Sequence, residues 1–164
     1  MARRGYAGRQ SMKTTIKTMK LINWIMASEF KRHLVPEQRA FISVIIRKIE
    51  KETPGRFQPL NCFLNAMALA LRGEPRISYM QGTLLHNGEK PIAHGWNLID
   101  GIRFDVTTPI NLFAGFGYHP EIHSFKLAHI MTYEGREISH DRVWKYVEAG
   151  GCCDKENCNH VPDL

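Results

Sequence analysis

The apolar residues along the first half of the chain follow a helical period. They recur at three- and four-residue steps over residues 11–34 and over 36–51, which predicts two amphipathic helices. Pro36 suits the first position of the second helix. Residues 62–72 are apolar almost all round, so they predict a helix buried on every side, with Asn61 as a suitable N-cap.

The second half of the chain reads mainly as strands. Alternating runs predict strands over residues 77–85, 92–99 and 102–107, and Asp100-Gly101 between the last two predicts a two-residue hairpin turn. A covering loop is expected over residues 109–120 and another strand over 125–133. Ser139 is expected to cap a last short helix over residues 141–148. Helices followed by strands correspond to an α+β fold.

Length and composition are those of one soluble domain. The chain has 164 residues, of which 43% are hydrophobic and 23% charged, and no apolar run approaches a membrane span. We expect a cytoplasmic protein without membrane contact, organised as an arm over residues 1–10, one domain over 11–149 and a tail over 150–164.

The net charge of +6 comes from the first twenty residues, which contain six basic residues and no acid. We expect residues 1–10 to form a disordered basic arm, most simply a solvated terminus. Contact with an acidic partner or with nucleic acid phosphates is the alternative. This arm underlies the second functional hypothesis, a catalytically inactive binding module.

Cys62 is the candidate nucleophile, because it stands at the start of the apolar helix. Helix N-termini favour a thiolate and offer N–H donors to an oxyanion, although a lone Cys is more often a small core residue. If the hairpin has a two-residue turn, then alternation puts four side chains on one face and Asn97 on the other. The four are His94, Trp96, Asp105 and Thr107.

Asp105 is then a diagonal neighbour of His94, so it is favoured over Asn97 as the group that orients a His94 base. Taken singly, His94 also fits a structural histidine, and Asp105 also fits a residue that begins a turn. Three other histidines compete as bases: His119, His123 and His129. The combination favours a Cys-His-Asp enzyme that acts on an amide or acyl bond.

Four short motifs resemble the papain-like and transglutaminase-like cysteine superfamily, in particular its small bacterial and phage members. They are Cys62-Phe63-x-Asn65-Ala66, Tyr79-x-x-Gly82, His94-Gly95-Trp96-Asn97 and Asp105-Val106-Thr107, within residues 56–108. The resemblance implies a Cys-bearing helix packed on an antiparallel sheet that carries His and Asp.

The resemblance also implies roles for single residues. Cys62 would be the nucleophile, His94 the base and Asp105 the orienting group. Gln58 matches the oxyanion-hole Gln of papain-like enzymes, at a shorter spacing, and fits a solvated loop residue equally well. Trp96 is a second candidate for the oxyanion or substrate site. Peptidase, glutamine deamidase and acyl or amide transferase activities share the same first step, and we expect a protein or peptide substrate.

The end of the chain is rich in possible zinc ligands, namely Cys152, Cys153, Cys158 and His160. Paired Cys-x-x-Cys modules are absent and adjacent cysteines bind one metal poorly, so an unstructured tail, or one with disulfides formed in air, is favoured over a zinc site. Since the body of the chain contains one cysteine, we expect a reducing compartment. No other cofactor is expected.

Overall fold

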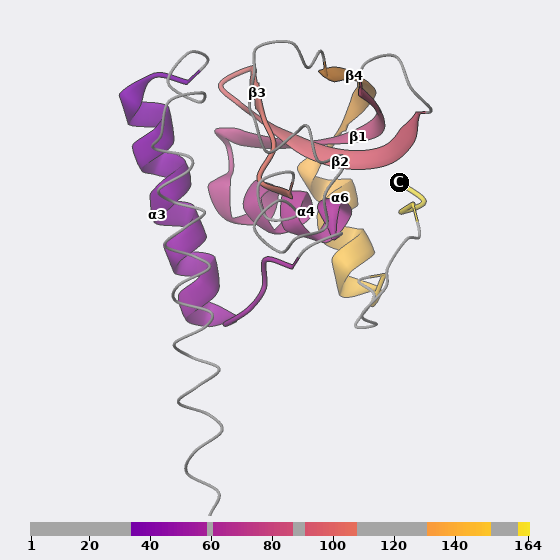
Figure 1. Ribbon diagram of the computed structural model, residues 1–164. Coiled ribbons are helices and arrows are strands. Elements are labelled where there is room, and N and C mark those ends of the chain that lie inside the picture. The colour runs from indigo at the N-terminus through magenta and orange to yellow at the C-terminus, as the bar shows by residue number, and fades with distance from the viewer. Residues whose placement is uncertain (1–33, 59–60, 87–90, 108–130, 152–160) are drawn as a thin grey trace, which may run out of the picture. The chain divides into compact units, whose positions relative to one another are not determined.

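The computed structural model describes residues 34–58, 61–86, 91–107, 131–151 and 161–164 (Figure 1). The chain divides into two compact units, Met1–Phe57 and Gln58–Leu164, which we treat separately. The predicted helix over residues 11–34, the loop over 109–120 and the basic arm lie outside the described residues, apart from Leu34. None of the described helices is long and apolar enough to span a membrane.

In the first unit, helix α3 covers Pro36–Glu52, as the apolar period predicts. Pro36 stands in its first turn, and the Gln38 side chain accepts a hydrogen bond from the Val35 N–H (3.1 Å). The helix ends at Thr53-Pro54-Gly55, where Gly55 has a φ of 78°. The Glu50 carboxylate secures this end by accepting from the Gly55 and Phe57 N–H groups (2.9 and 3.2 Å).

The second unit contains an antiparallel sheet in the order β3-β2-β1-β4 (Figure 1). Its strands are β1 (Ile77–His86), β2 (Ile92–Ile99), β3 (Ile102–Phe104) and β4 (Met131–Ile138). Asp100 and Gly101 have φ values of 49° and 82°, as in a type I′ turn, and Ile99 pairs with Ile102. The predicted two-residue hairpin and its register are therefore confirmed.

Helix α4 (Cys62–Gly73) packs against β1 and β2. It is largely buried, as its apolar surface predicts, and the Asn97 amide of β2 donates to the Ala66 carbonyl (2.8 Å). Helix α6 (His140–Glu148) packs against α4 through a 2.6 Å hydrogen bond between the His140 ring and the Ala70 carbonyl. The described residues thus form an α+β fold with three helices and a four-stranded antiparallel sheet, which confirms the predicted fold class.

Several predicted element boundaries were wrong. The strand expected over residues 125–133 continues to Ile138 as β4 (Met131–Ile138), and residues 125–130 lie outside the described residues. β4 is an edge strand and residues 134–137 are exposed, so its second half lacks the apolar alternation that marks a half-buried strand. β3 ends at Phe104, three residues early, because Asp105 turns back to bond the Thr107 N–H. Asn61 precedes α4 as predicted, but its side chain makes no capping bond.

Candidate active site

The candidate site begins at the first turn of α4. Cys62 is half-buried there and is a free thiol. One turn later, Asn65 is fully buried and holds the chain on both sides of it: its Nδ2 donates to the Gln58 carbonyl (2.8 Å) and to Thr107 Oγ1 (3.1 Å). Its Oδ1 accepts from the Gln58 N–H (3.2 Å). Asn65 therefore ties the segment that leads to Cys62 to the segment that follows β3.

His94 and Asp105 form the centre of the site. His94 is 1% exposed, and its Nε2 lies 2.7 Å from Asp105 Oδ2. Because a carboxylate only accepts hydrogen bonds, Nε2 carries the proton and Nδ1 is the nitrogen available for a second partner. The predicted contact between Asp105 and His94 is confirmed.

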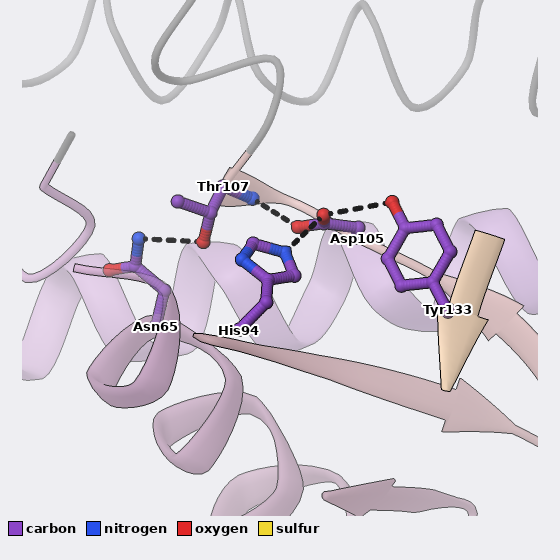
Figure 2. A network of polar contacts seen from close by, with 5 residues as sticks. All are labelled: Asn65, His94, Asp105, Thr107 and Tyr133. Carbon is purple, nitrogen blue, oxygen red and sulfur yellow. Dashed lines mark hydrogen bonds and ion pairs between the residues drawn. The ribbon is translucent and has the colours of Figure 1, made fainter. Parts of the chain in front are cut away.

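Asp105 is buried but fully satisfied (Figure 2). Its Oδ1 accepts from the Thr107 N–H (2.8 Å), and its Oδ2 accepts from the Tyr133 hydroxyl (3.1 Å) as well as from His94. A buried carboxylate with several donors stays ionised, since each donor stabilises its charge. Asp105 is thus a fixed negative charge behind the imidazole.

The environment of His94 favours the charged imidazolium. Burial lowers the pKa of His94, but the charge and hydrogen bond of Asp105 outweigh it, and a hydrogen bond and the charge of Cys62 add to the effect. Together they raise the pKa of His94 to about 10. The Asp105 carboxylate and the Cys62 thiol thus both favour the protonated form of the His94 ring.

Asn97 lies apart from this group. Its Nδ2 donates to the Ala66 and Ser78 carbonyls (2.8 and 3.1 Å), so it ties α4 to the sheet instead of orienting His94. This placement agrees with the alternation of β2. The competing bases His119, His123 and His129 lie outside the described residues.

Trp96 and Gln58 were candidates for an oxyanion or substrate role. Trp96 is 2% exposed. Its ring stacks with the His94 ring (6.3 Å between centroids) and meets the Tyr133 ring edge-on (5.2 Å), so it packs against the imidazole. Gln58 is half-buried four residues before Cys62, where Asn65 holds its main chain. Their proposed roles stay predictions.

The sequence interpretation assigned no role to Tyr133, which donates to Asp105. The Arg103 guanidinium lies over its ring, 4.2 Å from the centroid. No local signal connects Tyr133 with the hairpin, because β4 pairs with β1 and not with β2. Asn65 belongs to the Cys62 motif, but the sequence interpretation gave it no role. Its position among apolar residues could have predicted one, since a buried amide needs hydrogen-bond partners.

The described residues contain no group of three or more metal-ligating side chains. The four residues considered for zinc, Cys152, Cys153, Cys158 and His160, lie outside the described residues.

Comparison with known proteins gives no match to a protein-family model, to a curated protein or to a solved structure.

Proposed function

We propose that this chain is a cysteine-nucleophile enzyme of the papain-like or transglutaminase-like type that acts on an amide or acyl bond. One observation carries the proposal: the buried Asp105 carboxylate, which also accepts from Thr107 and Tyr133, holds the His94 Nε2 at 2.7 Å, while Cys62 at a helix N-terminus interacts with the same ring. A structural histidine needs partners, but it does not need a free thiol as one of them.

The arrangement supports a two-step reaction. His94 is held as the imidazolium, with a proton on Nδ1, and the Cys62 sulfur attacks the carbonyl carbon of the substrate as the thiolate. The negative oxygen of the tetrahedral intermediate is stabilised by N–H groups at the start of α4. The intermediate collapses to a thioester as Nδ1 returns the proton to the leaving amine or alcohol. Water or a second nucleophile, deprotonated by Nδ1, then attacks the thioester, releases the acyl group and restores the thiolate beside the imidazolium.

Asp105 keeps the ring in the reactive orientation throughout. It accepts from Nε2, which leaves Nδ1 for proton exchange with the reacting groups, and its charge stabilises the imidazolium. Peptide hydrolysis, glutamine deamidation and acyl or amide transfer share this chemistry and differ in the group that attacks the thioester. We propose a protein or peptide as the acyl donor.

The experiment that tests the proposal measures Cys62 alkylation by iodoacetamide at pH 7, quantified by peptide mapping because the chain has three other cysteines. We expect His94→Ala and Asp105→Asn to slow the reaction at Cys62 by about a hundredfold, since the thiolate loses its counterion. His140→Ala is the matched control, because it removes a histidine that contacts the other end of α4. His140 bonds the Ala70 carbonyl and pairs with Glu74, the residue after the helix.

Circular dichroism identifies variants that remain folded, and Cys62→Ser should be folded and inactive on peptide, glutamine and acyl substrates. If folded His94→Ala and Asp105→Asn alkylate as fast as the parent, then the triad is not functional. In that case the alternative hypothesis of an inactive binding module gains support.

A further inference from the structure

Residues 161–164 contact the sheet, and their side chains are alternately exposed and buried. Pro162 and Leu164 are buried, with Leu164 6% exposed, whereas Val161 is 41% exposed and Asp163 is also exposed. The Pro162 carbonyl accepts from Gln81 Nε2 (2.8 Å), and the Leu164 carbonyl accepts from the Arg136 guanidinium. Figure 1 shows this segment in yellow.

The two donors form one recognition unit. Gln81 of β1 and Arg136 of β4 are register partners in the sheet. They bond carbonyls two residues apart, and the side chains of the same two residues are buried. An extended peptide repeats every two residues: its alternate carbonyls and alternate side chains point to the same side. This surface therefore suits such a peptide, because two side chains donate to alternate carbonyls and alternate side chains are buried.

This surface lies on the face of the sheet that packs against the first turn of α4, where Cys62 stands. Gln81 is the register partner of Gly95, so both residues lie on this face, whereas the neighbouring His94 points to the other face. A Cβ on Gly95 would lie 3.0 Å from Phe63 Cα and 3.2 Å from Tyr79 Cε2, so the first turn of α4 and the Tyr79 ring meet at this point. The Tyr79 hydroxyl in turn donates to Gln81 Oε1 (2.9 Å).

Electrostatics agrees with this placement. The pKa of Tyr79 is raised first by burial and then by the charges of Cys62 and Tyr146. The Tyr79 hydroxyl therefore senses the thiol while its oxygen is bonded to the residue that holds Pro162. Tyr79 and Gln81 thus connect the first turn of α4 with Pro162.

We propose that Gln81 and Arg136 form the binding site for an extended peptide substrate and that residues 161–164 occupy it as a substrate-like segment that restricts access to Cys62. The inference rests on the proposed function and names its substrate class and its regulation. A tethered segment has an effective concentration of about a millimolar, so a substrate peptide must displace it to bind.

The first test measures binding by fluorescence anisotropy, with a labelled peptide of residues 159–164, Asn-His-Val-Pro-Asp-Leu. Leu164→Asp in the full chain places a charge at a buried position and should release the segment, whereas Val161→Asp introduces the same charge at an exposed position. We expect the Leu164→Asp chain to bind the peptide at least about tenfold more tightly than the parent and the Val161→Asp chain.

The donors are tested in the Leu164→Asp chain. Adding Arg136→Met or Gln81→Leu should weaken peptide binding at least about tenfold. Arg136→Met removes the charged donor to the Leu164 carbonyl, and Gln81→Leu removes the donor to the Pro162 carbonyl. Adding Arg142→Met, on the exposed side of α6, should leave the affinity unchanged. Equal affinity of the parent and the Leu164→Asp chain, or binding that ignores both donors, would overturn the inference.

The second test places the peptide beside the thiol. Saturating peptide should slow alkylation of Cys62 by a bulky maleimide in the Leu164→Asp chain by about tenfold or more, and binding without protection would refute the occlusion of Cys62. This measurement requires only that the thiol be accessible, and it does not depend on catalysis. Failure of the triad therefore appears as equal alkylation in His94→Ala, while failure of the peptide site appears as unchanged peptide affinity in Leu164→Asp.

Discussion

Replacing Asp105 by Asn removes the charge behind His94 and keeps the shape of the side chain. The Asp105 carboxylate is the chief reason that the pKa of His94 is raised to about 10 from an ordinary value of 6.5. Without it, burial is the largest remaining influence and lowers the pKa. We expect the pKa of His94 in Asp105→Asn to fall below 6.5.

This change alters how stability depends on pH. With Asp105 present, folded His94 keeps its proton above pH 6.5, where unfolded His94 has lost it. Its stabilising contribution is therefore complete below pH 6.5 and is lost as the pH rises toward 10. The loss amounts to about 1.4 kcal/mol per pH unit, or about 3 kcal/mol between pH 7 and pH 9. In Asp105→Asn, both states are neutral in this range and the loss disappears.

The assay is urea unfolding at pH 7, 8 and 9 in a Cys62→Ala background, which removes the thiol that also acts on the His94 ring. Cys62 contributes less to the pKa of His94 than Asp105 does, so the background preserves the effect. Asp100→Asn in the same hairpin is the control, since Asp100 pairs with Arg76 at the surface. The control should follow the slope of the Cys62→Ala parent.

Equal slopes in the parent and in Asp105→Asn would refute the reasoning, because they would mean that the carboxylate does not hold a proton on His94. NMR titration of the His94 ring gives the same answer independently. The ring should titrate near pH 10 in the parent and below 6.5 in Asp105→Asn.

Three further substitutions separate catalysis from packing. Tyr133→Phe removes one donor to Asp105. We expect the transition state to lose about 1 kcal/mol of stabilisation, so turnover should fall about fivefold while the melting temperature changes little. Asn97→Ala loses one hydrogen bond to α4 and one to β1, so urea unfolding should show a loss of about 2 kcal/mol in the free energy of unfolding with Cys62 alkylation unchanged. Gly135→Ala would put a Cβ 2.5 Å from Trp96 Cη2, and the same assay should show a loss of about 2 kcal/mol or more.

The sequence by itself determined the local parts of the candidate site. Asp100-Gly101 specifies a two-residue turn, and period-two alternation then puts His94 and Asp105 on one face and Asn97 on the other, so the contact at 2.7 Å was predictable. A segment that is apolar almost all round likewise predicted a buried helix directly after Asn61, with Cys62 at its start. These features depend on neighbours a few residues apart, and the chain pattern encodes such neighbours directly.

Only the tertiary structure decided which distant segments complete the site. Tyr133 reaches Asp105 because β4 lies at the edge of the sheet beside β1, an order that no local pattern states, and the polar second half of β4 also obscured the strand itself. Asn65 reaches Thr107 across 42 residues of chain, and Gln81 reaches Pro162 across 81. Such pairings are chosen by the combined burial and hydrogen bonding of the whole fold, and the side chains involved fit many local environments equally well.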